Sequence, residues 1–200
     1  MRTKFLAPIV IGALTLALAA PAGASHKRPP SIAAAVIEAS STEGFDDHRH
    51  DYDILLKAVL ATGLDGALSD PEAKLTVFAP NDNAFMRTAT LLGYTGSSEQ
   101  GTWDFLVGAF TTLGNGDPIP VLKNVLLYHV AEGRMKSSTV LQKSSIKTLL
   151  GERFEVDGLK LVDKDPDITN PRLKPYALDM RAGRGIIHGI NRVLIPIDIP

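Results

Sequence analysis

The chain has 200 residues, a formal net charge of −1 and no cysteine. Acidic and basic residues nearly balance, and the basic excess typical of nucleic-acid binding is missing, so no nucleic-acid partner is expected. Without cysteine the chain forms no disulfide, carries no thiolate nucleophile and has no cysteine-based metal site.

The first 24 residues have the pattern of a secretory signal peptide. Arg2 and Lys4 precede an almost entirely apolar run over 5–20, and a small-residue cleavage pattern follows at 22–24. A membrane anchor is the alternative, but the run is shorter than the ~20 apolar residues that a spanning helix needs. We therefore expect an exported product, periplasmic or extracellular, with a flexible leader over 25–30 and no transmembrane segment in the mature chain.

Helical periodicity dominates the next two thirds of the chain, and short strands dominate the last third. In chain order, the sequence first predicts a helix capped by Ser31, a helix that begins at the cap Asp51 and stops at Gly63, and a strand over 75–79. A helix ending near Leu92, helices over 102–113 and 121–127, and a strand through Tyr128 and His129 follow. The last third contains a hairpin at Asp157-Gly158 and strands over 176–180, 185–190 and 192–196. This order favours one α+β domain over 31–198 rather than alternating βαβ units.

The segment LTVFAPNDNAF, residues 75–85, places three polar residues between a strand and a helix. Asn81 or Asp82 is positioned to cap that helix, since a side-chain oxygen there accepts a bond from an unpaired amide of the first turn. A metal loop is the alternative, but no further acid follows at regular spacing. The pattern favours the cap, with Val77 and Phe85 as core anchors on either side.

Three segments, in order, resemble signatures of the fasciclin-like domain family: LTVFAPNDNAF at 75–85, LLYHVAEG at 126–133 and GIIHGINRVLIP at 185–196. The resemblance implies a wedge-shaped β-sandwich flanked by helices, and a secreted module that binds partners and mediates adhesion. Two positions depart from the pattern, since Gly189 replaces an aliphatic residue and Asn191 an acid. The stretch over 87–120 is longer than in many members, so partner choice need not follow the family.

The resemblance also supplies candidate partner-binding residues. Tyr128 and His129 match a pair implicated in integrin contact in animal matrix members, although a buried, hydrogen-bonded tyrosine or histidine is the simpler interpretation. Asp179 falls on the aspartate of an acidic adhesion motif, with an ordinary edge-strand aspartate as the alternative.

A second candidate surface lies on the expected helix over 102–113. Trp103 and Phe110 fall at helical spacing with Leu106, whereas Phe105 and Val107 lie on the other sides, and a helix that is apolar all round suits a buried position. Alternatively, at least one of the three aromatic residues is substantially exposed and anchors an apolar contact, because aromatic residues are favoured at interface hot spots.

Two loops carry residues of metal-binding type. His48, His50, Asp51 and Asp53 offer imidazoles and carboxylates suited to Zn²⁺ or Cu²⁺, but no distant ligand is identifiable and a solvated loop is expected. Asp163–Asp167 alternates like a Ca²⁺ loop but lacks the turn-making glycine of an EF-hand, which leaves only a weak surface site open.

No nucleophile accompanies the histidines His129 and His188, so the sequence predicts neither an enzyme nor a cofactor or tight metal site. The expected function is a secreted, non-catalytic binding or adhesion module for a cell-surface or matrix protein or polysaccharide. The alternative is a carrier of a small apolar ligand or a metal ion, which would need a concave apolar pocket.

Overall fold

The computed structural model describes residues 30–40 and 44–197. The expected signal peptide over 1–24 lies outside these ranges. The described elements are α1 Ile32–Ala39, α2 Asp53–Ala61, α3 Asp65–Leu68, β1 Leu75–Pro80, α4 Asp82–Leu91, α5 Glu99–Leu113, α6 Pro118–Tyr128, β2 Val130–Glu132, α7 Ser137–Val140, β3 Ser145–Lys147, β4 Arg153–Asp157, β5 Lys160–Val162, the 3₁₀ turn η1 Pro175–Ala177, β6 Met180–Ala182 and β7 Gly185–Ile190. No helix among them is long and apolar enough to cross a membrane.

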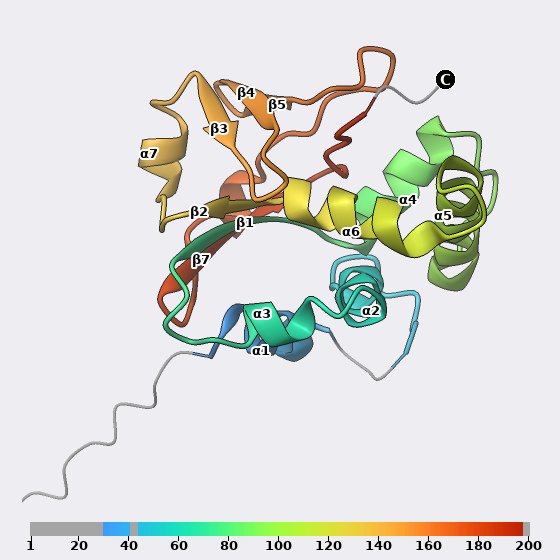
Figure 1. Ribbon diagram of the computed structural model, residues 1–200, viewed down its shortest axis with the longest axis horizontal. Helices are drawn as coiled ribbons and strands as arrows, with labels where there is room; N and C mark the ends of the chain where they lie inside the picture. The colour runs from blue at the N-terminus through green and yellow to red at the C-terminus, as the bar shows by residue number, and fades with distance from the viewer. Residues whose placement is uncertain (1–29, 41–43, 198–200) are drawn as a thin grey trace, which may run out of the picture.

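Two separate sheets form the β part of the α+β fold. The first has the strand order β2-β1-β7-β6, and the second has the order β3-β4-β5. Within the first sheet β1 and β7 are parallel, with Phe78 opposite His188, and the other pairings are antiparallel. Figure 1 shows α1, α2 and α3 on one side of the first sheet, the second sheet on the opposite side, and α4 and α5 together at one end.

The alternation of side chains along β1 builds two hydrophobic cores. Val77 and Ala79 point into the larger core, which the helices cover, whereas Phe78 points into a smaller core between the sheets. There the Phe78 ring meets Phe154 edge-on, with centroids 5.1 Å apart. The amphipathic pattern of the helices and the period-two pattern of β1 therefore account for the layered arrangement.

Most of the expected elements are present, with differences at three places. The strand expected over 176–180 is wrong, because the 3₁₀ turn η1 and the left-handed Asp179 occupy this stretch and β6 begins only at Met180. The hairpin at Gly158 joins β4 and β5, and Gly158 has a left-handed φ of 56° that glycine adopts without strain. Tyr128 ends α6 and His129 caps it, so the pair does not lie on a strand as expected. Residues 192–196 form no strand either, since their amides bond side chains such as Thr88 and His129 rather than a neighbouring strand.

The two departures from the family pattern have local explanations. A Cβ at Gly189 would lie 2.7 Å from the Cβ of Ala177, so only glycine lets η1 pack this closely against β7. Asn191 exchanges two hydrogen bonds with Arg172: its side-chain oxygen accepts from the Arg172 amide at 2.7 Å, and its own amide donates to the Arg172 carbonyl at 3.1 Å. Both residues therefore hold the segment that follows the second sheet against β7.

Candidate functional site

The corner between β1 and α4 uses its polar residues as helix caps. The Asn81 side-chain oxygen accepts a hydrogen bond from the Ala84 amide at 3.2 Å, which makes Asn81 the cap of α4. Its side-chain amide donates to the Arg49 carbonyl at 3.1 Å. Asn81 is buried, so both contacts are shielded from water. The prediction of a cap in this segment is confirmed for Asn81.

Asp82 caps a different helix. Its two carboxylate oxygens accept from the Asp53 amide at 3.1 Å and the Ile54 amide at 2.8 Å, which are the first amides of α2. The residue at the N-cap position of α2, Tyr52, makes no side-chain cap bond. The expectation that Asp51 caps α2 is therefore wrong, because the start of α4 lies against the start of α2 and supplies the acceptor.

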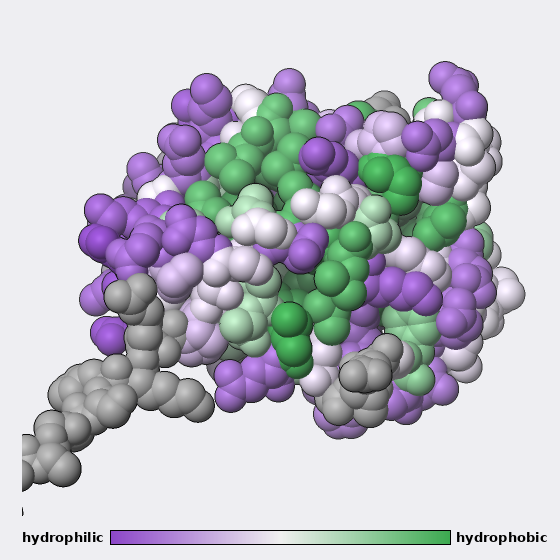
Figure 2. Space-filling model, turned by 60° about the horizontal axis from the view of Figure 1, so that its bottom comes forward, coloured by the Kyte–Doolittle hydropathy of each residue, from purple (hydrophilic) through white to green (hydrophobic). Residues whose placement is uncertain are grey.

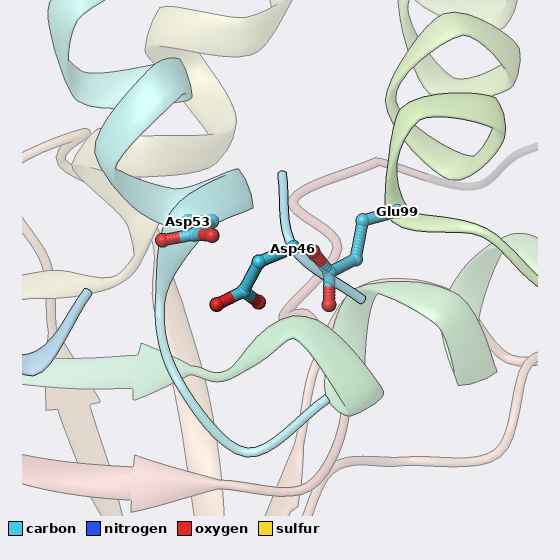
Figure 3. Close-up of side chains that lie close together, drawn as sticks. All are labelled: Asp46, Asp53 and Glu99. Carbon is cyan, nitrogen blue, oxygen red and sulfur yellow. The ribbon is translucent and has the colours of Figure 1, made fainter. Parts of the chain in front are cut away.

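Around this corner the fold gathers acidic side chains from distant segments. Asp51, Asp53, Asp82 and Glu99 are buried, whereas Asp46 is exposed at the rim. The carboxylate oxygens of Asp46, Asp53 and Glu99 lie within 4.8 Å of one another, as do those of Asp51, Asp82 and Glu99. Figure 3 shows Asp53 at the start of α2, Glu99 at the start of α5 and Asp46 on the loop between them. We refer to Asp46, Asp53 and Glu99 as the acidic triad.

Burial and mutual repulsion raise the pKa values of these acids. The pKa of Asp82 rises to about 9, mainly because the side chain is buried and also because it forms a hydrogen bond with Asp51. The hydrogen bonds from the amides of Ile54 and Asp53 lower this pKa but do not offset the rise. Burial and then the charge of Asp51 raise the pKa of Asp53 to about 6. Burial likewise raises the pKa of Glu99. At neutral pH a proton shared by Asp51 and Asp82 therefore neutralises part of the charge, while Asp53 is mostly ionised.

The hydrogen bonds around the acidic triad are incomplete. Glu99 and Asp47 exchange two bonds of 3.0 Å, since each amide donates to the other carboxylate, but the second oxygen of Glu99 has no hydrogen-bond partner. Neither carboxylate oxygen of Asp53 has a partner with full hydrogen-bond geometry. The backbone of Asp46 lies near enough to lower the pKa of Asp53, but burial outweighs it.

The two loop histidines do not join this cluster as ligands. His48 is exposed, and its Nδ1 lies 3.6 Å from an Asp51 oxygen. His50 is also exposed, and its ring centroid lies 6.2 Å from that of His48. The expectation that the 48–53 loop lacks a distant partner for its acids does not hold, however, because Asp82 and Glu99 come from other elements.

Tyr128 and His129 are both buried. The Tyr128 hydroxyl donates to the Arg153 carbonyl at 3.0 Å and so connects α6 to the second sheet. His129 Nδ1 bonds the Val125 carbonyl at 2.7 Å, and its Nε2 accepts from the Leu194 amide at 2.9 Å. These two bonds require a neutral imidazole with its proton on Nδ1, and burial lowers its pKa to about 4.

His188 has a similar environment in β7. Its Nε2 bonds the Met135 carbonyl at 2.8 Å, and its Nδ1 accepts from the Asp179 amide at 3.2 Å. The ring is fully buried, and burial lowers its pKa. Both histidines therefore use both ring nitrogens to hold backbone segments together.

Asp179 is exposed and has a left-handed φ of 58°. It lies just before β6 rather than on an edge strand. Its carboxylate accepts from the amide of Ser137 at 2.8 Å and from the hydroxyl of the same residue at 2.6 Å. Those bonds place it as a cap of α7, so part of its bonding capacity is already used.

None of the three aromatic residues of α5 is exposed. Phe110 is buried, and Trp103 and Phe105 are partly buried against the larger core. The Phe105 ring packs on Tyr94, with centroids 5.3 Å apart, and Lys57 Nζ lies 5.3 Å from the centroid of Trp103. The expectation of a substantially exposed aromatic is not met, but Trp103 and Phe105 are only partly buried, so a partner contact through them stays a prediction.

The acids of the loop over 163–167 accept hydrogen bonds from backbone amides of the loop itself and of the C-terminal segment. Asp163 accepts from the Ile195 amide at 2.8 Å, and Asp165 accepts from the amides of Asp167 and Ile168 at 3.0 Å. These acids therefore shape the loop, and none of them belongs to the groups of converging carboxylates.

Three cavities of the described residues differ in size and lining. An apolar groove of about 60 Å³ runs between α1–α3 and the α6–β2 junction, and an apolar cavity of about 100 Å³ lies beneath α4, α5 and α6. A cleft of about 470 Å³ beside β3 is polar, and its lining includes Lys143, Lys147 and Arg153.

Comparisons with known proteins agree with this architecture. The Fasciclin domain family matches residues 50–196. The chain is 28% identical to the uncharacterized protein sll1735 of Synechocystis, over 72% of this chain and 89% of the relative. It is 30% identical to the transforming growth factor-beta-induced protein ig-h3 of Sus scrofa, over 72% of this chain but only 18% of that protein.

A solved structure shares the fold. The FAS1 domain pair from the insect cell adhesion molecule fasciclin I superposes with a TM-score of 0.53 at 15% identity, and the match covers 83% of this chain and 51% of that one. The class is therefore an α+β domain of the FAS1 type. The chain belongs to the fasciclin domain family, as its three sequence segments indicated.

The acidic triad is the part of the site that the sequence pattern missed. Asp46, Asp53 and Glu99 are separated along the chain and carry no spacing motif. Glu99 follows Ser98, the cap of α5, and an acid in a first helical turn is ordinary. Only the tertiary contact between the loop before α2 and the start of α5 brings these residues together.

Proposed function

We propose that the domain is an exported, non-catalytic binding module that mediates protein contacts at a cell surface or in a matrix. The observation that carries the proposal is the match to the Fasciclin domain family over residues 50–196, since such domains occur in extracellular proteins and generally act in adhesion. The fold neighbour, fasciclin I, is itself an insect cell adhesion molecule.

The hydrogen bonding of the two buried histidines supports a non-catalytic role. A general base needs an imidazole nitrogen within reach of a substrate or nucleophile. His129 and His188 each have both ring nitrogens bonded to backbone atoms of the fold, and both side chains are buried.

Cavity size favours adhesion over the carriage of a small apolar ligand. Pockets that enclose such ligands usually have volumes of roughly 300–1,000 Å³. The apolar groove and cavity of the described chain have about 60 and 100 Å³. The larger cleft is lined by basic and polar residues and does not suit an apolar ligand.

The rim of the apolar groove is the surface that we propose for partner contact. Leu127, which neighbours the Tyr128–His129 pair, lines the groove together with Leu64 and Leu149. Leu149 is 41% exposed, whereas Tyr128 and His129 are buried, with His129 part of the groove's lining. Figure 2 shows hydrophobic side chains in patches between polar ones on the face toward α1–α3. A partner would thus contact the aliphatic flank of the pair rather than the pair itself.

The proposal is tested by adhesion of beads coated with the purified chain to intact cells of the producing organism and to their matrix. We expect adhesion above that of albumin-coated beads and a reduction of about fivefold or more with Leu149→Asp, because a charge on the rim opposes desolvation. The matched control is Tyr176→Asp, which places the same charge on a side chain that is 79% exposed and outside the groove. Adhesion no stronger than that of albumin, or equal loss in both variants, would contradict the proposal.

A further inference from the structure

We propose that the acidic triad, Asp46, Asp53 and Glu99, binds a divalent cation, and that the ion is Ca²⁺. Such an ion would connect the loop before α2 to the start of α5. This inference is independent of the proposed adhesion function.

The unsatisfied bonding of two buried side chains points to a ligand. Asp53 is 4% exposed, yet neither of its carboxylate oxygens has a hydrogen-bond partner. Glu99 is fully buried and leaves one oxygen without a partner, while Asp47 occupies the other. Buried polar atoms in folded proteins are almost always bonded, so these oxygens are set up for a group that the chain does not supply.

The alternative partners around the triad are already engaged elsewhere. Lys57 is on α2, but its Nζ lies over the Phe45 ring at 4.4 Å. The amides of Asp53 and Ile54 bond Asp82, and the Asp47 amide bonds Glu99. Among the described residues, no ion pair joins a lysine or arginine to Asp46, Asp53 or Glu99. The compensating charge therefore comes from solution, as a bound cation or as protons, and the experiment below separates the two.

Donor chemistry and spacing select the type of ion. All donors are carboxylate oxygens, which suit hard cations rather than Zn²⁺ or Cu²⁺. The oxygens lie within 4.8 Å of one another. Both Ca²⁺ and Mg²⁺ fit within this limit, but Ca²⁺ accepts a flexible, irregular shell of oxygens at roughly 2.3–2.6 Å, whereas Mg²⁺ demands a near-ideal octahedron, which three carboxylates from separate segments do not impose. Asp46 is exposed at the rim, which leaves room for water to complete the coordination shell.

The side chain of Trp103 provides a local signal for binding. It is the only tryptophan of the chain and lies four residues after Glu99 on α5. The experiment therefore titrates CaCl₂ into the purified chain, stripped with EGTA, and follows tryptophan emission and thermal unfolding. We expect saturable binding with a dissociation constant on the order of 10⁻⁴ M, as in extracellular Ca²⁺ modules. At 10 mM Ca²⁺ the unfolding midpoint should rise by roughly 5 °C or more.

Isosteric variants separate ion binding from simple charge repulsion. Asp53→Asn and Glu99→Gln should each weaken Ca²⁺ binding by about tenfold or more, because each removes one anionic ligand. Without Ca²⁺, Asp53→Asn should unfold at a higher temperature than the wild type, since it relieves repulsion among the acids. With Ca²⁺ the order should reverse. The matched control is Asp104→Asn, which removes an exposed carboxylate from the same helix and should leave binding unchanged.

Several outcomes would overturn the assignment. The first is that 10 mM Ca²⁺ changes neither the tryptophan emission nor the unfolding midpoint of the wild type. The second is that Asp53→Asn raises the unfolding midpoint by the same amount with and without Ca²⁺. The third is that the wild type binds Zn²⁺ in place of Ca²⁺. The second outcome would mean that protons alone neutralise the cluster.

Discussion

The environment of His129 predicts a loss of stability in mild acid. Its Nδ1 bonds the Val125 carbonyl and its Nε2 accepts from the Leu194 amide. Protonation of Nε2 would place two donors face to face in a buried site. The folded state therefore keeps the imidazole neutral, whereas the unfolded chain protonates it near its ordinary pKa of 6.5.

The magnitude follows from the two pKa values of His129. Burial lowers the folded pKa to about 4, so between pH 6.5 and 4 the unfolded chain binds more protons than the folded one. Stability is then fully present above pH 6.5 and declines as the pH falls. Each pH unit in this interval corresponds to about 1.4 kcal/mol, which gives a loss of about 2 kcal/mol by pH 5 and about 3 kcal/mol by pH 4.

The assay must isolate this residue from acids that act in the opposite direction. Burial raises the pKa values of Asp53 and Asp163 to about 6, so their protonation favours the folded state over the same pH range. Urea unfolding of the wild type and of His129→Gln, followed by tryptophan emission at pH 7.5, 6 and 5, gives the difference between the two proteins.

The stability advantage of the wild type over His129→Gln should shrink by about 2 kcal/mol between pH 7.5 and pH 5, because only the wild type carries this imidazole. His50→Gln, which removes an exposed histidine, is the matched control. A difference that stays constant with pH, or an equal change in the control, would refute the reasoning.

Three further predictions concern the caps, the buried tyrosine and the loop histidine. Asn81→Ala should lower the free energy of unfolding by about 1 kcal/mol, and Asp82→Ala should lower it by about 2 kcal/mol because two amides lose their acceptor. Equal urea midpoints for the two variants would contradict this difference. Tyr128→Phe should cost about 1 kcal/mol through loss of the bond to Arg153 and leave bead adhesion intact; lost adhesion at unchanged stability would reverse that assignment. Calorimetry should find no sub-micromolar Zn²⁺ binding that His48→Ala abolishes, because among the described residues this exposed side chain belongs to no group of three converging ligand atoms.

Local patterns were sufficient to predict much of the fold. The cap at Asn81, the hairpin at Gly158 and the strand at 75–80 each follow from a few neighbouring residues whose backbone preferences agree with the final structure. The three family segments were informative as well. Two of them, at 75–85 and 185–196, contain the strands β1 and β7, which pair at the centre of the first sheet.

Features that depend on contacts between distant segments were not predictable in the same way. Asp82 was expected at the start of its own helix, but its acceptor atoms serve α2, whose position relative to α4 is set by tertiary packing. His129 was expected on a strand because its neighbours are apolar. The end of a helix can have the same local composition, so composition alone did not separate the two. The exposure of Trp103 depends on the packing of neighbouring side chains around α5, which its own helical spacing does not specify.

The parallel pairing of β1 with β7 has a consequence for how the chain reaches its native state. Phe78 and His188 are neighbours in the sheet although more than half of the chain separates them. The central ladder therefore forms only after the last tenth of the sequence is available, and such non-local pairing slows folding. A chain that ends before Gly185 would leave β1 with one edge unpaired.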